Sequence, residues 1–544
     1  MTGAGGKVAK LLLATLILHL LLIQPNHPGA MTWRALLLFP LELPVVIALL
    51  LALPKAASRL LRGGLTLWLV GIAVIKAADL AMYIAFARSF NPHADFGLIA
   101  AGINLGAGTF GLPIWVATII AAVAGVVILI TLLAATWWAL AAWAAIDLPR
   151  GAAISAAVCA MLAFGVAVAE AGQALRLWTL PMHPPGAAFT ARLSWEKVGR
   201  YQAMAADLQA FRQAAQTDPF ADGTGLLTRL AGRDVLVIFV ESYGRTSFDT
   251  ALYAETHVPT LRAAQNRLAQ VGLEARSGWL TSPIAGGQSW LAHATFASGL
   301  QIGDQQRYGS FLASPRQTLW QIGAQAGYRT AAIVPAITMA WPEGQRLGFD
   351  TILAAADLGY RGKPFNWVTM PDQFTLARGP SLLPASDQPL LAQIVLISSH
   401  APWVPVPRLL PWDSLGDGTE FNDMATGGES PKDIWRDNDK VRDQYRQAID
   451  YSLQTVMDFV ARQGPDAPLV IVLGDHPPAG FVSMIRGRDV PVHLIGPKSA
   501  LEPLADWGLA PGLIPDASSP VWPMESFRDR FLTSFSSFPV GKVP

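Results

Sequence analysis

The first 175 residues of this 544-residue chain are almost entirely apolar, and this feature constrains the fold more than any other. The apolar character is concentrated in five stretches, at residues 9–24, 34–54, 63–87, 114–145 and 151–173. Because a bilayer core offers no water to backbone N–H and C=O groups, such stretches cross it as helices. The last four are long enough to cross about 30 Å of hydrocarbon, and we interpret the first as an uncleaved span. The sequence therefore predicts a multi-span α-helical membrane domain at residues 1–175 with about five transmembrane helices.

The basic residues between these stretches predict an orientation. Lysines and arginines of the amino terminus, of residues 55–62 and at Arg150 fall on one side of a five-span bundle. By the positive-inside rule that side is cytoplasmic. We therefore expect a multi-pass protein of the inner (cytoplasmic) membrane whose carboxyl-terminal region is exported to the periplasm or another extracytoplasmic space. Three carboxylates lie in or near the spans, and each either faces the helix bundle or has a function: Glu42, Asp79 and Glu170.

The rest of the chain has the composition of an ordinary enzyme. Residues 176–230 combine turn signals with a helical pattern, and we interpret them as an amphipathic connector. From residue 231 on, predicted strands alternate with predicted helices; the strands are 234–240, 330–334, 393–398, 469–473 and 490–495. This alternation predicts an exported α/β catalytic domain at 231–544, with a largely parallel sheet flanked by helices.

Charge and cysteine content exclude several classes of partner and site. A formal net charge of +1 gives no reason to expect a nucleic-acid partner. The only cysteine, Cys159, lies within an apolar stretch. Disulfides within the chain and zinc sites built on cysteines are therefore excluded.

Two of the predicted strands end directly on residues of the metal-ligand type. The run that ends at Val240 is followed by Glu241, and the run 469–473 is followed by Gly474-Asp475-His476. Ligands of open α/β sheets gather at the carboxyl ends of strands. Two carboxylates and one imidazole suit a hard-to-borderline divalent cation. A single acidic residue after a strand is commonly a helix cap, so the prediction of a metal site depends mainly on the Asp475-His476 pair.

Two further segments hold side chains that are able to do chemistry. Ser289 follows Gly286-Gly287-Gln288 and opens a helical pattern, so it is either the helix N-cap or a hydroxyl nucleophile at the positive end of the helix. His293 lies one turn further on and either faces the same site or packs in the core. His400 follows a predicted strand, and is either an ordinary loop histidine or a contact for an anionic substrate oxygen.

The order of these motifs resembles the sulfatase branch of the alkaline phosphatase superfamily. More narrowly, it is similar to lipoteichoic acid synthases and lipid A phosphoethanolamine transferases, which also carry about five spans before an exported catalytic domain. The four motifs are Phe239-Val240-Glu241-Ser242, Gly286-Gly287-Gln288-Ser289, Ser398-Ser399-His400-Ala401-Pro402 and Gly474-Asp475-His476. Because the motifs and the spans together extend over the chain, the resemblance covers essentially all of it.

The resemblance implies a metal site and a covalent mechanism. It implies one divalent metal, manganese or zinc with magnesium as a further possibility, held by Glu241, Ser289, Asp475 and His476. It implies that Ser289 is the catalytic nucleophile, although the transferases of this family use threonine at that place.

The resemblance also implies a set of residues that bind the substrate. His400 would hold the transferred phosphate, and Trp341 stands where these enzymes place a substrate-contacting tryptophan. Lipoteichoic acid synthases carry an arginine two residues after that tryptophan, and here the nearest substitute is Arg346. We add His293 to this predicted set because of its position one turn after Ser289.

The predicted function is a membrane-anchored transferase. It moves a phosphoglycerol or phosphoethanolamine headgroup from a phospholipid donor to an envelope glycan or glycolipid, through a phospho-serine intermediate. Formylglycine chemistry is disfavoured, since the residues after Ser289 lack the proline and arginine of the C/S-x-P-x-R motif. The alternatives are a metal-dependent phosphodiesterase or phosphatase on the same scaffold, and a non-catalytic envelope protein.

Overall fold

The computed structural model describes residues 4–92, 95–182, 184–516 and 518–537. The chain divides into two compact units. The amino-terminal unit consists of residues 1–84 and 88–207, and the carboxyl-terminal unit consists of residues 85–87 and 208–544. The longest element of the predicted connector is one helix, α8 (Phe189–Ala214), whose residues belong to both units.

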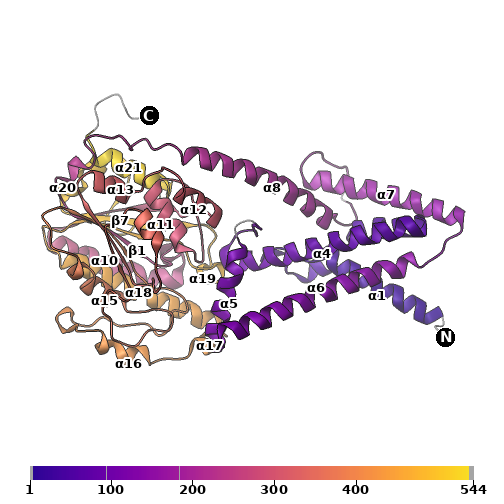
Figure 1. Ribbon diagram of the computed structural model, residues 1–544, viewed down its shortest axis with the longest axis horizontal. Helices are drawn as coiled ribbons and strands as arrows, with labels where there is room; N and C mark the ends of the chain where they lie inside the picture. The colour runs from indigo at the N-terminus through magenta and orange to yellow at the C-terminus, as the bar shows by residue number, and fades with distance from the viewer. Residues whose placement is uncertain (1–3, 93–94, 183, 517, 538–544) are drawn as a thin grey trace. The chain divides into compact units, whose positions relative to one another are not determined.

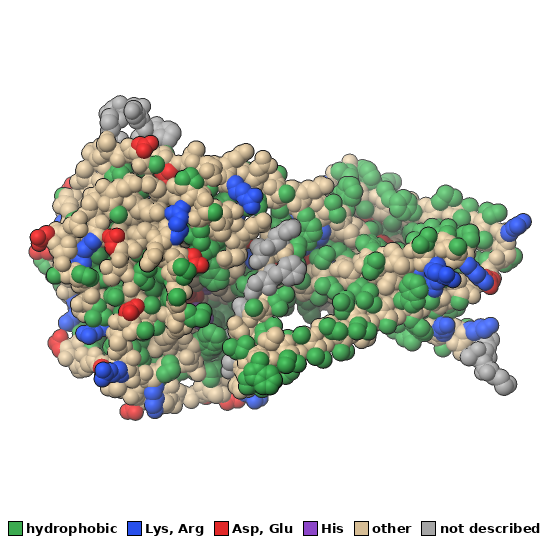
Figure 2. Space-filling model, viewed as in Figure 1, with side chains coloured by type: hydrophobic (Ala, Val, Ile, Leu, Met, Phe, Trp, Pro, Cys, Tyr) green, Lys and Arg blue, Asp and Glu red, His purple; other side chains and the backbone are tan. Residues whose placement is uncertain are grey.

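The amino-terminal unit is entirely helical in its described part (Figure 1). Its helices are α1 (Ala4–Ile23), α2 (Trp33–Leu36), α3 (Glu42–Ala52), α4 (Lys55–Phe86), α5 (Phe96–Phe110), α6 (Ile114–Ala144), α7 (Arg150–Ala174) and the first part of α8. Four of them, α1, α4, α6 and α7, are long and apolar enough to cross a membrane. Figure 2 shows hydrophobic side chains covering these helices, and large apolar side chains of α6 and α7 are exposed. These surfaces suit contact with lipid rather than water, and the prediction of a multi-span helical region is confirmed.

The predicted second span, at residues 34–54, does not form one long helix. The chain makes the short helix α2, passes through Pro40 in a non-helical conformation, and then forms α3 with 11 residues. Pro40 explains the break, because a proline disfavours helical geometry at the residue before it. At about 1.5 Å per residue, α3 is roughly half as long as a bilayer core is thick.

The three carboxylates that the sequence places in or near the spans all contact α8. Glu42 accepts a hydrogen bond from the backbone N–H of Ala191 at 2.9 Å, and Glu170 pairs with Arg192 at 3.1 Å. Asp79 forms an ion pair with Lys197 at 2.6 Å, and both side chains are almost fully buried. The three carboxylates noted in the sequence therefore face the bundle and contact the amino-terminal half of one helix.

The carboxyl-terminal unit is built on one nine-stranded mixed sheet. Its strands are β1 (Val235–Val240), β2 (Glu274–Thr281), β3 (Arg329–Val334), β4 (Thr351–Ala354), β5 (Leu390–Val395), β6 (Leu469–Gly474), β7 (Asp489–Gly496), β8 (Ala510–Pro511) and β9 (Val521–Pro523). The order is β4-β3-β5-β1-β6-β7-β2-β8, with β9 beside β2. The first five strands in this order are parallel, whereas β7 is antiparallel to both β6 and β2.

Helices cover both faces of this sheet (Figure 1). They are α9 (Thr246–Asp249), α10 (Ala251–Gln270), α11 (Ser289–Ser298), α12 (Gln305–Leu312), α13 (Leu319–Gln325), α14 (Pro342–Arg346), α15 (Asp372–Arg378), α16 (Asn422–Ala425), α17 (Pro431–Ile434), α18 (Asn438–Ala461), α19 (Gly480–Ser483), α20 (Lys498–Leu501) and α21 (Ser526–Phe535). Alternate residues of β1 enter two separate cores, one shared with α11, α13 and α21 and the other with α10, α15 and α18. Because successive strand residues point to opposite faces, a strand buried on both sides has to be apolar throughout, as β1 and β6 are. The predicted α/β class with helices flanking a sheet is confirmed.

Candidate active site

Three neighbouring parallel strands end at the same edge of the sheet. The central strand β1 lies between β5 and β6, and Phe239 of β1 pairs with Val395 on one side and Leu473 on the other. The residues that follow these strands are therefore brought together: Glu241 after β1, Asp475-His476 after β6, and the segment leading to His400 after β5. This is the crevice in which α/β sheets hold their ligands.

Glu241, Asp475 and His476 form one buried cluster. One ligand atom from each lies within 4.8 Å of the others. The exposed fraction is 5% for Glu241 and 0% for both Asp475 and His476. The Ser289 hydroxyl donates a hydrogen bond to Glu241 Oε2 at 2.8 Å and lies 3.2 Å from His476 Nε2. The four residues predicted to bind the metal are thus in mutual contact or close to it.

Ser289 is not the N-cap of its helix. The N-cap of α11 is Gln288, and Ser289 is the first helical residue. Its hydroxyl is bonded to Glu241 rather than to a backbone N–H of the first helical turn. The hydroxyl is therefore held at the positive end of α11 and directed at the buried carboxylate, which is the arrangement that a nucleophile requires.

Hydrogen bonds to neighbouring backbone groups orient the ligand atoms of Asp475 and His476. Asp475 Oδ1 accepts hydrogen bonds from the backbone N–H groups of Ser242 at 2.9 Å and His476 at 2.6 Å. His476 Nδ1 lies 2.9 Å from the carbonyl oxygen of Pro477, so it carries a proton and donates to that oxygen. The other imidazole nitrogen, Nε2, is thereby left facing Ser289 and Glu241 as a ligand atom.

Burial and the crowding of charges shift the pKa values of all three cluster residues. Burial raises the pKa of Asp475 to about 8, and the neighbouring Glu241 carboxylate adds to the rise. Burial alone would lower the pKa of His476, but the Asp475 and Glu241 carboxylates raise it to about 9. Burial would likewise raise the pKa of Glu241, yet His476 holds it well below its usual value. Two carboxylates in one dry site thus depend on a positive charge beside them.

The donor set of this cluster fits a divalent cation. Among the described residues, Asp475 Oδ2 is a buried oxygen without any hydrogen-bond partner. An orphaned carboxylate oxygen is costly in a protein interior unless something coordinates it. Two carboxylates, an imidazole Nε2 and a hydroxyl together match Zn²⁺ or Mn²⁺ better than a soft metal.

Unusual backbone geometry surrounds the cluster. Ser242, directly after Glu241, has φ of 60°, and Gln288, directly before Ser289, has φ of 68°. Residues other than glycine rarely adopt this left-handed conformation, and it tends to occur at functional sites. Gly474 meets a different constraint, because a Cβ at this position would lie 1.8 Å from the carbonyl oxygen of Tyr243. The end of β6 can approach the segment that follows β1 this closely only with glycine there.

The two further histidines lie at the margin of the cluster. His400 is close enough for its charge to help lower the pKa of Glu241. His293 stacks at a tilt on Phe239 of β1, with ring centroids 4.2 Å apart, and its Nε2 is buried without a hydrogen-bond partner among the described residues. Burial lowers the pKa of His293 to about 4, so its imidazole is neutral at pH 7. Their roles in substrate binding stay predictions.

Trp341 and Arg346 make their contacts elsewhere in the unit. Trp341 precedes α14 and packs against Phe349, with ring centroids 6.1 Å apart. Arg346 uses two nitrogens of its guanidinium on the backbone, Nε on Leu312 at 2.8 Å and Nη2 on Ser314. These contacts stabilise the end of α12, and they leave the predicted substrate role of both residues as a prediction.

Asp372 supports the His400 segment, and no local sequence pattern predicts this role. Its buried carboxylate accepts hydrogen bonds from the backbone N–H groups of Ile397 at 2.9 Å and Ser398 at 2.8 Å. Ser399 in turn donates a hydrogen bond to the carbonyl oxygen of Glu241 at 2.7 Å. Asp372 follows a proline at the start of a short helix, where a carboxylate is ordinary, so only the structure reveals this contact.

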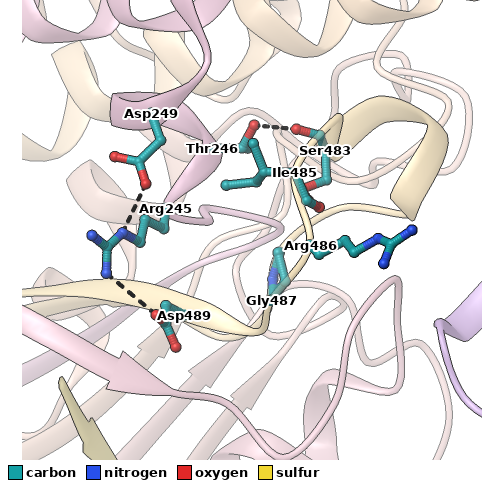
Figure 3. Close-up of a pocket in the computed structure, with 9 residues that line it drawn as sticks. Arg245, Thr246, Asp249, Ser483, Ile485, Arg486, Gly487 and Asp489 are labelled. Carbon is teal, nitrogen blue, oxygen red and sulfur yellow. Dashed lines mark hydrogen bonds and ion pairs between the residues drawn. The ribbon is translucent and has the colours of Figure 1, made fainter.

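A cavity of about 280 Å³ lies behind the Asp475-His476 loop and is lined in part by Pro477 (Figure 3). Two arginines, Arg245 and Arg486, and two carboxylates line it, and both carboxylates pair with Arg245, Asp249 at 2.9 Å and Asp489 at 3.4 Å. Because these carboxylates neutralise Arg245, we do not assign the cavity to a phosphate group.

Residues 233–490 match the protein-family model described as Sulfatase. The match includes every residue of the predicted site, from Glu241 to His476. This part of the chain is therefore a sulfatase-family domain, and the resemblance read from the four motifs is confirmed. No curated protein matches the chain.

Several solved structures resemble the chain at low sequence identity. The lipoteichoic acid synthase LtaP from Listeria monocytogenes is 12% identical, with a TM-score of 0.34 over 53% of this chain and 71% of that chain. The C-terminal periplasmic domain of EcEptC from Escherichia coli is 14% identical, with a TM-score of 0.37 over 56% and 83%. The phosphoglycerol transferase GacH from Streptococcus pyogenes, in complex with sn-glycerol-1-phosphate, is 13% identical, with a TM-score of 0.35 over 61% and 91%.

Proposed function

We propose that this chain, with its sulfatase-family domain at residues 233–490, is a membrane-anchored and metal-dependent phosphotransferase. In this proposal it moves a phosphoglycerol or phosphoethanolamine headgroup from a phospholipid to a hydroxyl group of an envelope glycan or glycolipid. The observation that carries the proposal is the Ser289 hydroxyl, held 2.8 Å from Glu241 beside the buried Asp475-His476 pair. A lone helix cap would need none of these three partners.

The proposed reaction has two halves that share one covalent intermediate. In the first, Ser289 Oγ attacks the phosphorus of the lipid phosphodiester, a bond from Oγ to phosphorus forms, and the bond from phosphorus to the diacylglycerol oxygen breaks. The Ser289 proton leaves along its hydrogen bond to Glu241 Oε2 and is passed on to the departing diacylglycerol oxygen, so that Glu241 ends this half ionised, as it began. In the second half an acceptor hydroxyl attacks the same phosphorus, the bond from phosphorus to Ser289 Oγ breaks, and the acceptor's proton returns to Ser289 Oγ.

Glu241, Asp475, His476 and Ser289 are the residues that would hold the metal. When bound, a divalent cation lowers the pKa of a coordinated hydroxyl and offsets the charge of phosphate oxygens. The hydrogen bond from His476 Nδ1 to Pro477 orients the ring for this role. In this proposal His400 binds an oxygen of the transferred phosphate, and the hydrogen bond from Ser399 to the backbone of Glu241, which joins its segment to the cluster, supports that role.

A lipid donor accounts for the apolar helices. A hydrolase of soluble substrates has no need of four long apolar helices, whereas an enzyme that takes its donor from the bilayer does. We place the protein in the cytoplasmic membrane with its carboxyl-terminal unit outside. This orientation requires residues 34–54 to cross the membrane as well, and labelling of single cysteines introduced on either side of that stretch would test it.

The function is tested with the purified full-length protein, supplied with Mn²⁺ or Zn²⁺ and with fluorescent phosphatidylglycerol or phosphatidylethanolamine. We expect labelled diacylglycerol to be released from one of the two lipids. We also expect the intact mass of the protein to rise by one phosphoglycerol or phosphoethanolamine group. In Ser289→Ala both signals should disappear, with a loss of turnover on the order of 10³-fold or more.

Ser298→Ala is the matched control, because Ser298 ends the same helix and its hydroxyl only caps the N–H of Leu300. Full release by Ser289→Ala would remove Ser289 as the nucleophile. Free headgroup produced at one rate with and without a glycan acceptor would instead establish a phosphodiesterase. Absence of release from both lipids in the metal-loaded protein would contradict the lipid donor.

A further inference from the structure

Trp435 lies at the outer end of an aromatic stack that leads to the candidate active site. Its ring stacks on Trp403, with centroids 5.9 Å apart and planes only 5° from parallel. Trp403 Nε1 donates a hydrogen bond to the carbonyl oxygen of Ser399 at 2.7 Å, and the Ser399 hydroxyl is bonded to the backbone of Glu241. Two residues therefore connect Trp435 to the first residue of the buried cluster.

Trp435 also contacts both of the segments that carry the site histidines. Its Nε1 donates a hydrogen bond to the carbonyl oxygen of Pro402 at 3.3 Å, two residues after His400. Its ring meets Phe481 edge-on, with centroids 6.0 Å apart, and Phe481 follows His476 by five residues. The tryptophan is thus held between the loop after β5 and the loop after β6.

The Trp435 ring is nevertheless well exposed. Its exposed fraction is 44%, whereas Ile434 before it is 2% exposed and Trp403 beneath it is 4% exposed. A large aromatic ring that is fixed by three contacts and left open has already lost its rotational freedom. A ligand that covers it therefore gains apolar contact at little entropic cost.

A polar cavity of about 480 Å³ is lined in part by Ile434, the residue before Trp435, and by Val404, the residue after Trp403. Its polar lining residues are Arg408, Asp423, Glu429, Gln444 and Gln447. One cation stands among two carboxylates here, and Glu429 is also paired with Lys440 at 2.6 Å, so the lining has no excess positive charge for a phosphate. Planar amides, carboxylates and a guanidinium do suit the hydroxyl groups of a neutral ligand, and the volume is in the range of small-molecule sites.

We propose that Trp435 and this cavity form a binding subsite for a neutral glycan. The C–H face of one sugar ring covers the exposed tryptophan, and side chains such as Gln444 bind hydroxyl groups of the sugar in the cavity. Because Trp435 adjoins the segments of His400 and His476, a glycan bound there brings a hydroxyl group toward Ser289. The role of this glycan as acceptor rests on the proposed function, whereas its binding does not.

The test measures binding of laminarihexaose, cellohexaose and maltohexaose, three neutral glucose hexamers, to the full-length protein by titration calorimetry. We expect one or more of them to bind. The Kd should rise roughly tenfold in Trp435→Ala, the change that corresponds to about 1.4 kcal/mol of lost ring contact. Trp435→Phe keeps an aromatic face but loses the hydrogen bond to Pro402, so its Kd should stay within about threefold of wild type. Ser289→Ala should bind the glucan as the wild type does.

Diacylglycerol release without glycan is measured in parallel and separates this inference from the proposed function. Release that stays within about twofold of wild type in Trp435→Ala, together with weaker glucan binding, supports the subsite. Equal affinities in wild type and Trp435→Ala, or no binding of any hexamer at millimolar concentration, would overturn it. If Trp435→Ala and Trp435→Phe lose glucan binding and diacylglycerol release to the same extent, the side chain only holds the Pro402 loop. That result would also overturn the subsite. Failure of release with Trp435-dependent binding intact would refute the transferase and leave the subsite standing.

Discussion

Two buried carboxylates, Asp79 in the amino-terminal unit and Asp475 in the carboxyl-terminal unit, differ in how their oxygens are hydrogen-bonded. In the amino-terminal unit, Asp79 has hydrogen bonds on both oxygens, from Lys197 and Phe90 to Oδ1 and from Asn26 to Oδ2. In the carboxyl-terminal unit, Asp475 has an oxygen with no hydrogen-bond partner among the residues that the structure describes, and it lies beside a second buried carboxylate, Glu241. The first carboxylate is satisfied by the chain itself, and the second is not.

This difference separates a structural charge from a functional one. A buried ion pair that is fully hydrogen-bonded can persist without further help. Two carboxylates that share a dry site repel each other, and the repulsion is relieved only by protonation or by a cation. The raised pKa values of Asp475 and His476 show that protonation relieves the repulsion in the metal-free protein. A bound divalent metal would relieve it by supplying the positive charge.

The largest expected effect comes from Asp475→Asn. The amide keeps an oxygen for the N–H groups of Ser242 and His476 but removes the charge that a metal needs. Turnover should fall on the order of 10³-fold, and added Mn²⁺ or Zn²⁺ should no longer raise the melting temperature of the variant. Activity assays and metal titration followed by differential scanning fluorimetry would measure both changes.

Asp489→Asn is the matched control for that variant. Asp489 is the first residue of β7, and it is paired with Arg245 at 3.4 Å rather than placed beside a second carboxylate. The control should bind metal as the wild type does. An Asp475→Asn protein with normal metal content and normal activity would show that Asp475 is a structural carboxylate like Asp79 and not a metal ligand.

The second effect concerns the amino-terminal unit. Asp79→Ala leaves the Lys197 ammonium buried without its partner carboxylate, and breaking a buried pair in this way costs about 3–5 kcal/mol. The double variant Asp79→Leu/Lys197→Met removes both charges and should recover much of the loss. Helical circular dichroism of the full-length protein during heating in detergent would follow the change. Asp147→Ala, which breaks the exposed pair with Lys55, should have little effect, and an equal loss in both single variants would contradict the structural role of Asp79.

The sequence predicted the parts of the site that depend on local pattern. β1 and β6 are apolar runs buried on both faces, and the residues after them could be assigned to one edge of the sheet from the rule for parallel strands. Ser289 was recognised as the start of a helix from its glycines and the following pattern. Its hydrogen bond to Glu241 could only be hypothesised, because it joins residues 48 positions apart.

Other features depend on long-range contacts that no local pattern encodes. β2 reads as a mixture of polar and apolar residues from Glu274 to Thr281, and only its pairing with β7 defines it. The apolar pattern of 34–54 predicts a continuous span, whereas the chain is not helical at Pro40. Arg346 was assigned to substrate by resemblance, yet its guanidinium is engaged by two backbone carbonyls of residues distant in sequence.

The pH dependence of stability should sharpen the comparison further. The pKa of Asp475 is raised from 3.8 to about 8, so in the metal-free protein its ionisation destabilises the fold progressively as pH rises between these values. The pKa of His476 is raised from 6.5 to about 9, so the stability it contributes is complete below 6.5 and is lost as pH rises through 9. With a chelator present, the melting temperature of the carboxyl-terminal unit should therefore fall as the pH rises from about 4 to about 9, and saturating Mn²⁺ or Zn²⁺ should make this fall smaller.

The lowered pKa of Glu241 makes stability rise with pH instead, but only below its ordinary value of 4.5. A chelated protein whose melting temperature rises with pH from 6 to 9 would contradict the coupled cluster.

The smallest effect is expected from Ser242→Ala. The Ser242 hydroxyl donates a hydrogen bond to Glu241 Oε1 at 3.1 Å, so it orients a metal ligand without being one. Loss of such an outer contact typically weakens metal affinity about 10-fold to 100-fold, and we expect the lower end because Glu241 keeps its contacts with Ser289 and His476. Titration of Zn²⁺ against a competing chelator would measure the change, and excess metal should restore turnover. The comparison would fail at this point if the variant lost activity that excess metal could not restore, because Ser242 would then act in the reaction itself rather than on the ligand beside it.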